Sequence, residues 1–210
     1  MNLIKLAVKP SEYFEENKEG EIQKREPIKL RYLFIALIIL SVLSSVVQTM
    51  VMPADTEQAL NIFNMSEKTF TILQHVGSGI LSIVGAWIFV NILYLVNKVL
   101  ISSVENKEIE EKKYFKSLLY FRYIVTAIIG LVLSITLSLI LKDDNTLIMV
   151  SSINNLFIKL WATYILFGIL KYYVQTKKLH KILPTILYIF TIIGTGFVIY
   201  GNMVISKLGL

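Results

Sequence analysis

Long uninterrupted apolar runs are the feature that most constrains this chain of 210 residues. A helix needs about 20 apolar residues to cross the roughly 30 Å hydrocarbon core of a bilayer. Five stretches approach or exceed that length, and they cover approximately residues 32–52, 72–97, 118–141, 156–174 and 182–205. Helices in water-soluble domains average only about 11–12 residues. The sequence therefore predicts an all-α membrane protein with a bundle of five transmembrane helices.

The fourth stretch admits two interpretations. If residues 147–170 span the membrane, Lys159 lies at mid-bilayer, where a lysine costs about 2.5–3.5 kcal/mol, and Asn154 and Asn155 add to that cost. If residues 156–174 span it, both asparagines move to the interface and Lys159 lies one turn inside, within reach of the headgroups. We prefer the second frame. The alternative is four spans with a re-entrant segment.

Basic residues predict the orientation, because lysine and arginine accumulate in cytoplasmic loops. Seven lie in residues 1–31, five in residues 98–116 and four in residues 171–181, whereas residues 53–71, 142–146 and 206–210 hold one each. We therefore expect a cytoplasmic N-terminus and an external C-terminus. The net charge of +6 follows from this bias and from anionic headgroups, not from nucleic-acid binding.

The polar segments are too short for a soluble catalytic domain. In the cytoplasmic segment 1–31, residues 11–24 predict a short amphipathic helix with Ser11 as its N-cap. Its apolar residues Tyr13, Phe14 and Ile22 are expected to enter the headgroup layer.

A second cytoplasmic helix is expected over residues 105–116, running into the third span. It would carry an i,i+4 pair between Glu108 and Lys112. Two interpretations of these polar segments remain open. They anchor the protein at the membrane surface, or they form a docking surface for a cytoplasmic partner.

Residues that would support catalysis are scarce. The two histidines, His75 and His180, have no cysteine or second histidine at ligand spacing, so we expect no metal site. The segment His75–Gly79 faintly suggests an intramembrane serine protease, but no histidine is available on a facing helix. We expect no catalytic residues, no cofactor and no enzyme.

Polar residues at membrane depth are the remaining candidates for function: Asn91, Asn155 and Lys159, with Asn97 and Arg122 also inside spans. No span contains an acid that would pair with Lys159. Three explanations compete for this lysine: it reaches the interface, it contacts lipid phosphate, or it pairs with an anionic ligand or an acid of another subunit. Asn91 is of the type that makes interhelical hydrogen bonds.

Small residues predict how the helices pack, since lipid removes the hydrophobic force between them. Stripes of such residues occur in four spans, and they include Ser41 and Ser45, Ser78 and Ser82, Thr126 and Gly130, and Gly194, Gly196 and Gly201. These stripes favour a compact bundle.

A family resemblance rests on two short motifs and the overall layout. Residues 8–16 read VKPSEYFEE shortly before the first span, and residues 113–119 before the third span read KYFKSLL. This order resembles the bacterial branch of the Yip1 family, with residues 32–205 as the five-helix domain. The DLYGP-like and GY signatures of the eukaryotic branch are absent, so a Rab-GTPase role does not carry over.

The resemblance implies a non-enzymatic, multi-pass protein of the bacterial cell membrane that works by binding others. Some bacterial relatives accompany ABC exporters or protect against membrane-active peptides. We therefore expect an accessory or scaffold subunit of a membrane transport or a toxin and antimicrobial-peptide resistance system. Its partners would be membrane lipids and other membrane subunits, such as an ABC exporter. The alternative is a small transporter or channel, to which Lys159 and Asn91 point.

Overall fold

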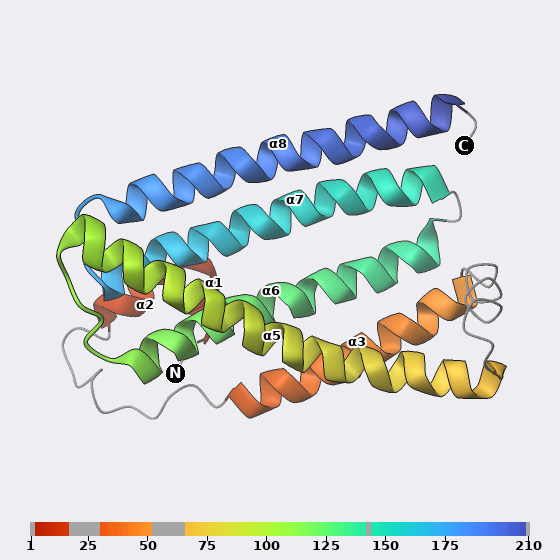
Figure 1. Cartoon of the computed structure of the whole chain (residues 1–210), viewed down its shortest axis with the longest axis horizontal. Helices are drawn as coiled ribbons and strands as arrows, with labels where there is room; N and C mark the ends of the chain where they lie inside the picture. The colour runs from red at the N-terminus through yellow and green to blue at the C-terminus, as the bar shows by residue number, and fades with distance from the viewer. Residues whose placement is uncertain (1–2, 17–29, 52–65, 142–143, 209–210) are drawn as a thin grey trace.

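The computed structural model describes residues 3–16, 30–51, 66–141 and 144–208, and within these ranges all regular structure is helical (Figure 1). Two short helices, α1 (Leu3–Val8) and α2 (Pro10–Glu16), precede the long ones. The long helices are α3 (Leu30–Val51), α5 (Glu67–Glu105), α6 (Lys112–Ile140), α7 (Asp144–Gly168) and α8 (Leu179–Leu208). A single π-helical turn, η2 (Ile169–Tyr173), continues α7.

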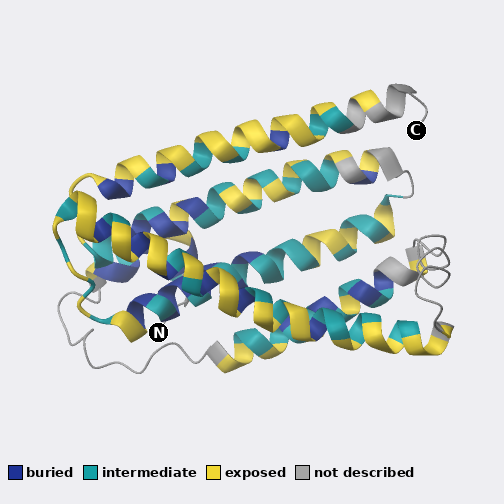
Figure 2. Ribbon diagram, viewed as in Figure 1, coloured by how far each residue is buried: buried dark blue, intermediate teal, exposed yellow. Residues whose placement is uncertain are grey.

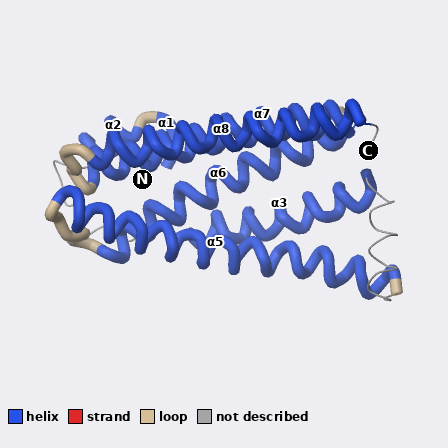
Figure 3. Tube along the Cα trace, turned by 45° about the horizontal axis from the view of Figure 1, so that its top comes forward, coloured by secondary structure: helices blue, strands red, loops and turns tan. Residues whose placement is uncertain are grey.

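The long helices form a bundle in which α6 lies between two pairs. Helices α3 and α5 pack against each other and against α6, whereas α7 packs against both α6 and α8. Figure 3 shows α7 and α8 as one layer and α3 and α5 as the other, with α6 crossing between them. Helices α1 and α2 lie at one end of this bundle, together with residues 106–111 and 174–178. We call this end, defined by those four segments, the closed end.

Helix length and composition fit the predicted membrane protein. Four helical stretches are long and apolar enough to cross a bilayer, and a shorter apolar stretch covers Arg31–Val47 of α3. The all-α bundle of five helices is thereby confirmed. The candidate span in α7 and η2 runs over Met149–Tyr173 without reversal, which gives the re-entrant alternative no support. The predicted orientation stays a prediction, although the basic segments 98–116 and 171–181 both lie at the closed end.

Helix α5 is longer than the span predicted over residues 72–97. Its 39 residues would measure about 58 Å at 1.5 Å per residue, roughly twice the hydrocarbon thickness. The uncharged stretch is therefore the part that crosses, and the final two turns, from Lys98 to Glu105, project past it at the closed end. The helix ends at Asn106, whose left-handed conformation (φ 51°) serves as a C-cap.

The helix predicted over residues 105–116 is wrong in its first half. Residues 106–111 are not helical, and α6 begins only at Lys112. Glu108 and Lys112 are therefore not one turn apart on a helix, and no ion pair joins them in the described part of the chain. The physical reason is the left-handed C-cap at Asn106, which turns the chain away from the axis of α5.

Buried residues concentrate at the closed end rather than along the whole bundle (Figure 2). The core combines α1 and α2 with the first half of α6, the last turns of α7 and the closed-end half of α5. On the sides that face away from the bundle, α5 and α8 expose long apolar faces, which include Ile88, Ile92, Phe190 and Phe197. Lipid tails would cover these faces in a membrane, so exposed apolar surface there is expected.

Small residues lie where α3 and α5 meet, which fits the compact bundle that their stripes favour. The hydroxyl of Ser78 lies 2.8 Å from the carbonyl oxygen of His75 in its own helix and 3.3 Å from that of Ser41 in α3. Ser45 Oγ lies 2.9 Å from His75 Nδ1. A Cβ on Gly79 would already touch Ile38 at 3.3 Å. The stripe predicted in the fifth span is not an interface. Gly194, Gly196 and Gly201 face open space within the described structure, because only the opposite side of α8 packs against α7.

Candidate functional site

The closed end is built around the two N-terminal helices, which are inserted into the bundle. Trp161 of α7 donates from Nε1 to the carbonyl oxygen of Ala7 at 2.8 Å. The hydroxyls of Tyr13 and Tyr114 lie 3.3 Å apart. Because Trp161 and Tyr114 belong to α7 and α6, these contacts fasten a segment near the start of the chain to two central helices.

Tyr13 and Phe14 do not enter the headgroup layer as predicted. They are 2% and 1% exposed and pack inside the protein. The ring of Phe14 stacks on that of Tyr172 with centroids 6.5 Å apart. The ring centroids of Tyr114 and Tyr173 lie 5.2 Å apart. The predicted N-cap Ser11 lies inside α2, and residues 17–24 with Ile22 are outside the described ranges. An amphipathic sequence shows an apolar face but not which surface will cover it, and here the protein covers it.

Glu105 connects the end of α5 to the start of α8. Its carboxylate accepts hydrogen bonds from the backbone N–H groups of Lys177, Lys178 and Leu179 at 2.6–2.7 Å. The first N–H groups of a helix lack partners within the helix and carry a partial positive charge, so a carboxylate stabilises them. Burial alone would raise the pKa of Glu105, but the three hydrogen bonds outweigh it and lower the pKa below its ordinary value.

His180 is also part of the α8 start rather than of a reactive site. It is buried. Its backbone N–H donates to the Thr176 hydroxyl at 3.1 Å, and its ring Nδ1 lies 2.7 Å from the Thr176 carbonyl oxygen. The ring packs edge-on against Phe167. No group of three potential metal ligands occurs among the described residues.

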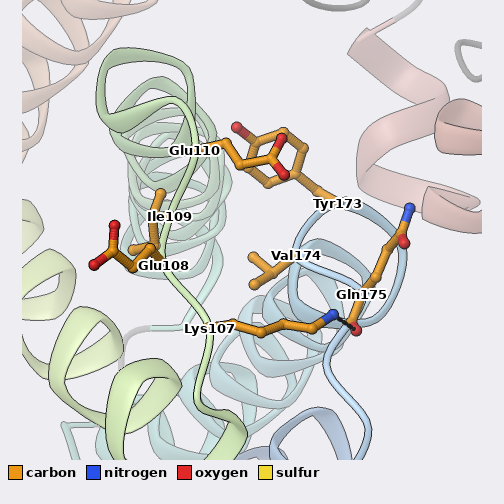
Figure 4. Close-up of a pocket in the computed structure, with 7 residues that line it drawn as sticks. All are labelled: Lys107, Glu108, Ile109, Glu110, Tyr173, Val174 and Gln175. Carbon is orange, nitrogen blue, oxygen red and sulfur yellow. Dashed lines mark hydrogen bonds between the residues drawn. The ribbon is translucent and has the colours of Figure 1, made fainter.

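A cavity of about 360 Å³ opens at the closed end between residues 107–110 and 173–175 (Figure 4). Lys107 crosses one side and donates from Nζ to the carbonyl oxygen of Gln175 at 2.6 Å. Glu108 and Glu110 also line the cavity, are exposed, and form no ion pair within the described residues. The two loops are thus fixed to each other while two carboxylates remain available to a partner.

The predicted candidate Asn91 has a structural role. Its side-chain amide donates to the carbonyl oxygen of Trp87 at 2.7 Å, and its Oδ1 accepts from Lys116 Nζ at 2.6 Å. Lys116 also lies 4.8 Å from the ring centroid of Tyr94. Asn91 therefore joins α5 to α6 and keeps the Lys116 ammonium paired near the membrane boundary. Asn155 is exposed on α7 and is not brought to any described cavity.

Lys159 borders a second cavity, of about 240 Å³, that α5, α6, α7 and α8 line together. Arg122 of α6 lines the same cavity, although the sequence marked it only as a charge inside a span. Its Nε donates to the carbonyl oxygen of Ala162 at 2.6 Å, three residues from Lys159 on α7. Lys159 itself belongs to the apolar stretch Met149–Tyr173; its predicted depth of one turn below the interface stays a prediction.

Sequence reasoning missed the Arg122–Lys159 juxtaposition because the two residues come from different helices. A signal existed: both are basic residues inside apolar stretches that contain no acid. Their relative rotation and height depend on how α6 packs against α7, and no local pattern encodes that.

Comparison with known families adds one finding. A family model described as the Yip1 domain matches residues 4–200, nearly the whole chain. Searches of curated proteins and of solved structures each found no match. The matched range includes nearly all of α1, all of α2 and the long helices up to residue 200 of α8, so the N-terminal segment belongs to the family domain.

Proposed function

Because this chain belongs to the Yip1 family of membrane proteins, we propose that it is a non-enzymatic accessory or scaffold subunit. It would serve a membrane transport system or a toxin and antimicrobial-peptide resistance system in a bacterial cell membrane. An ABC exporter is the kind of partner we expect, with ATP hydrolysis supplied by that partner.

The closed end carries this proposal. A binding surface must keep its shape, and here three cross-links fix it: Trp161 to Ala7, Glu105 to the start of α8, and Lys107 to Gln175. Pre-ordered loops lose little conformational entropy on binding. These described hydrogen bonds join the helices and loops of the closed end to one another and do not assemble a cluster of titratable groups.

Glu108 and Glu110 suggest the chemistry of the partner. If the closed end is cytoplasmic, as the lysine distribution predicts, these acids face a membrane surface that is itself negatively charged. A basic segment of a partner would relieve that repulsion and fill the cavity between the two loops. Exposed charges of this kind act mainly on the association rate and on specificity.

Purification in a mild detergent followed by mass spectrometry tests the proposal. We expect wild-type protein to retain another membrane subunit, and the double variant Glu108→Lys, Glu110→Lys to lose most of it. Glu15→Lys is the matched control, since Glu15 is an exposed acid on α2 outside the cavity. Recovery of this chain alone, under conditions that keep other complexes intact, counts against an accessory role.

A small transporter or channel is the second candidate, and the membrane-depth cavity beside Lys159 favours it. Asn91, the other residue that points to transport, makes hydrogen bonds to Trp87 and Lys116. Liposomes that contain the purified protein would show solute flux that Lys159→Ala abolishes. Flux that is equal in that variant removes Lys159 from the transport argument.

A further inference from the structure

The membrane-depth cavity combines two positive charges with no described negative charge. Arg122 and Lys159 line it, and none of its described lining residues is Asp or Glu. The one ion pair within the described residues joins Lys9 and Glu12 at the closed end. A lone basic side chain in an apolar environment is costly, and two of like sign at one cavity repel each other. An anion in the cavity would remove both costs.

Arg122 is held so that most of its donors remain unused. It is only 7% exposed. Within the described residues it donates one hydrogen bond, from Nε–H to the carbonyl oxygen of Ala162. A guanidinium carries five N–H donors in a planar fork. The bond from Nε fixes the plane of the fork against α7 and leaves the four terminal N–H groups for the cavity.

Further donors reach the cavity from three helices. Lys159 comes from α7 and lies on the exposed rim, whereas Tyr123 and Thr191 come from α6 and α8. The hydroxyls of Tyr123 and Thr191 make no hydrogen bond within the described structure. By contrast, Thr126 and Thr163 already donate to carbonyl oxygens of their own helices. The residues that line this cavity thus include two charged side chains and two with hydroxyls that make no described hydrogen bond.

We propose that this cavity binds a phosphate group. Arginine pairs with phosphate through two parallel hydrogen bonds, and lysine adds a compact positive charge. Donors on three helices suit an anion with several oxygens better than a planar carboxylate. The volume of about 240 Å³ far exceeds the about 30 Å³ of one water, so a phosphate ester fits as well as the free ion.

Two sources present this chemistry: the headgroup of an anionic phospholipid, drawn in from the surrounding bilayer, and inorganic phosphate. Lys159 lies within the apolar stretch Met149–Tyr173, where a positive charge is costly. A phosphate group beside its ammonium would offset that cost. This site is separate from the acids of the closed end, so the proposal stands independently of the partner-binding function.

Lipid titration of the full-length protein in detergent tests the proposal. Phosphatidylglycerol, inorganic phosphate and diacylglycerol, which lacks phosphate, are added separately, and thermal unfolding and native mass spectrometry report binding. The variants are Lys159→Gln and Arg122→Gln. Lys98→Gln is the control, because Lys98 is an exposed lysine near the membrane boundary that does not line the cavity.

We expect phosphatidylglycerol to stabilise the wild type and Lys98→Gln alike, and Lys159→Gln to weaken its binding at least about tenfold. The same dependence on Lys159 with inorganic phosphate would support the site and identify the free ion as a source. Equal titrations for the wild type and Lys159→Gln with both ligands would overturn the proposal, as would equal stabilisation by diacylglycerol. If Arg122→Gln does not fold, Lys159→Gln decides alone, because Lys159 is exposed and its side chain makes no described hydrogen bond.

Discussion

Gly168 is a point of close approach between α7 and the N-terminal helices, and replacing it with alanine tests how the closed end is held. A Cβ at this position would lie 2.4 Å from Pro10 Cβ and 2.6 Å from Pro10 Cγ. Carbon atoms in contact normally lie about 3.5–4.0 Å apart. Since the proline ring is rigid, α1 and α2 must move away by about 1 Å.

The expected cost follows from two opposing effects. Overpacking a well-packed interior costs about 1–3 kcal/mol, whereas alanine favours a helix over glycine by about 0.5–1 kcal/mol. Gly168 already has ordinary right-handed helical angles (φ −59°, ψ −45°), so alanine adds no backbone strain. We expect a net loss of about 1 kcal/mol in unfolding free energy from the midpoints of these ranges, and at most about 2.5 kcal/mol.

Thermal unfolding and amide hydrogen exchange in detergent measure both parts of this prediction. Gly168→Ala should lower the melting temperature and speed exchange in residues 3–16. The matched controls are Gly77→Ala and Gly194→Ala, where a Cβ meets nothing within 4 Å in the described structure. These should be neutral or slightly stabilising. If Gly168→Ala behaves like the controls and residues 3–16 remain protected, the docking of α1 and α2 described here is wrong.

Three further predictions concern individual hydrogen bonds. Glu105→Gln should lower the unfolding free energy by about 0.5–2 kcal/mol. Because the pKa of Glu105 is lowered in the folded protein, its carboxylate stabilises the fold fully above its ordinary pKa, and this stabilisation is lost as pH falls through the lowered pKa. The melting temperature of the variant should therefore change less with pH than that of the wild type. Trp161→Phe removes the bond to Ala7, should cost about 0.5–1.5 kcal/mol, and should speed exchange in α1 but not in α5. Ser45→Ala removes the contact with His75 and should cost about 0.6 kcal/mol in thermal unfolding, and a variant as stable as wild type would argue against that contact.

The long helices could be predicted from the sequence because each is a local property of the chain. An apolar run such as residues 182–205 has no stable state in lipid other than a helix, whose backbone groups are satisfied internally. Small residues such as Ser41 and Ser78 also indicated close packing of the helices, but not that α3 and α5 would be the pair that meets. The open side of α8 was not, because Gly194 looks the same in the sequence whether it faces a helix or lipid.

The closed end could not be predicted because its contacts join segments far apart in the chain. Tyr13 meets Tyr114, and Trp161 meets Ala7. Likewise, Glu105 resembles one more polar residue of a cytoplasmic helix until the start of α8 is placed beside it. Lys159 was identified as a candidate, but its neighbour Arg122 was found only once α6 and α7 were packed together.

The central claim is that residues 106–111 and residues 174–178 lie on one side of the membrane and that the start of α5 lies on the other. Site-directed labelling tests this claim most directly. The chain has no native cysteine, so single variants at exposed positions report cleanly: Ser66→Cys, Glu108→Cys and Lys177→Cys. In intact bacterial cells, a membrane-impermeant thiol reagent should label Ser66→Cys only. The other two should react after the membrane is permeabilised. Labelling of Glu108→Cys and Lys177→Cys from outside, or equal labelling of all three, would contradict the account.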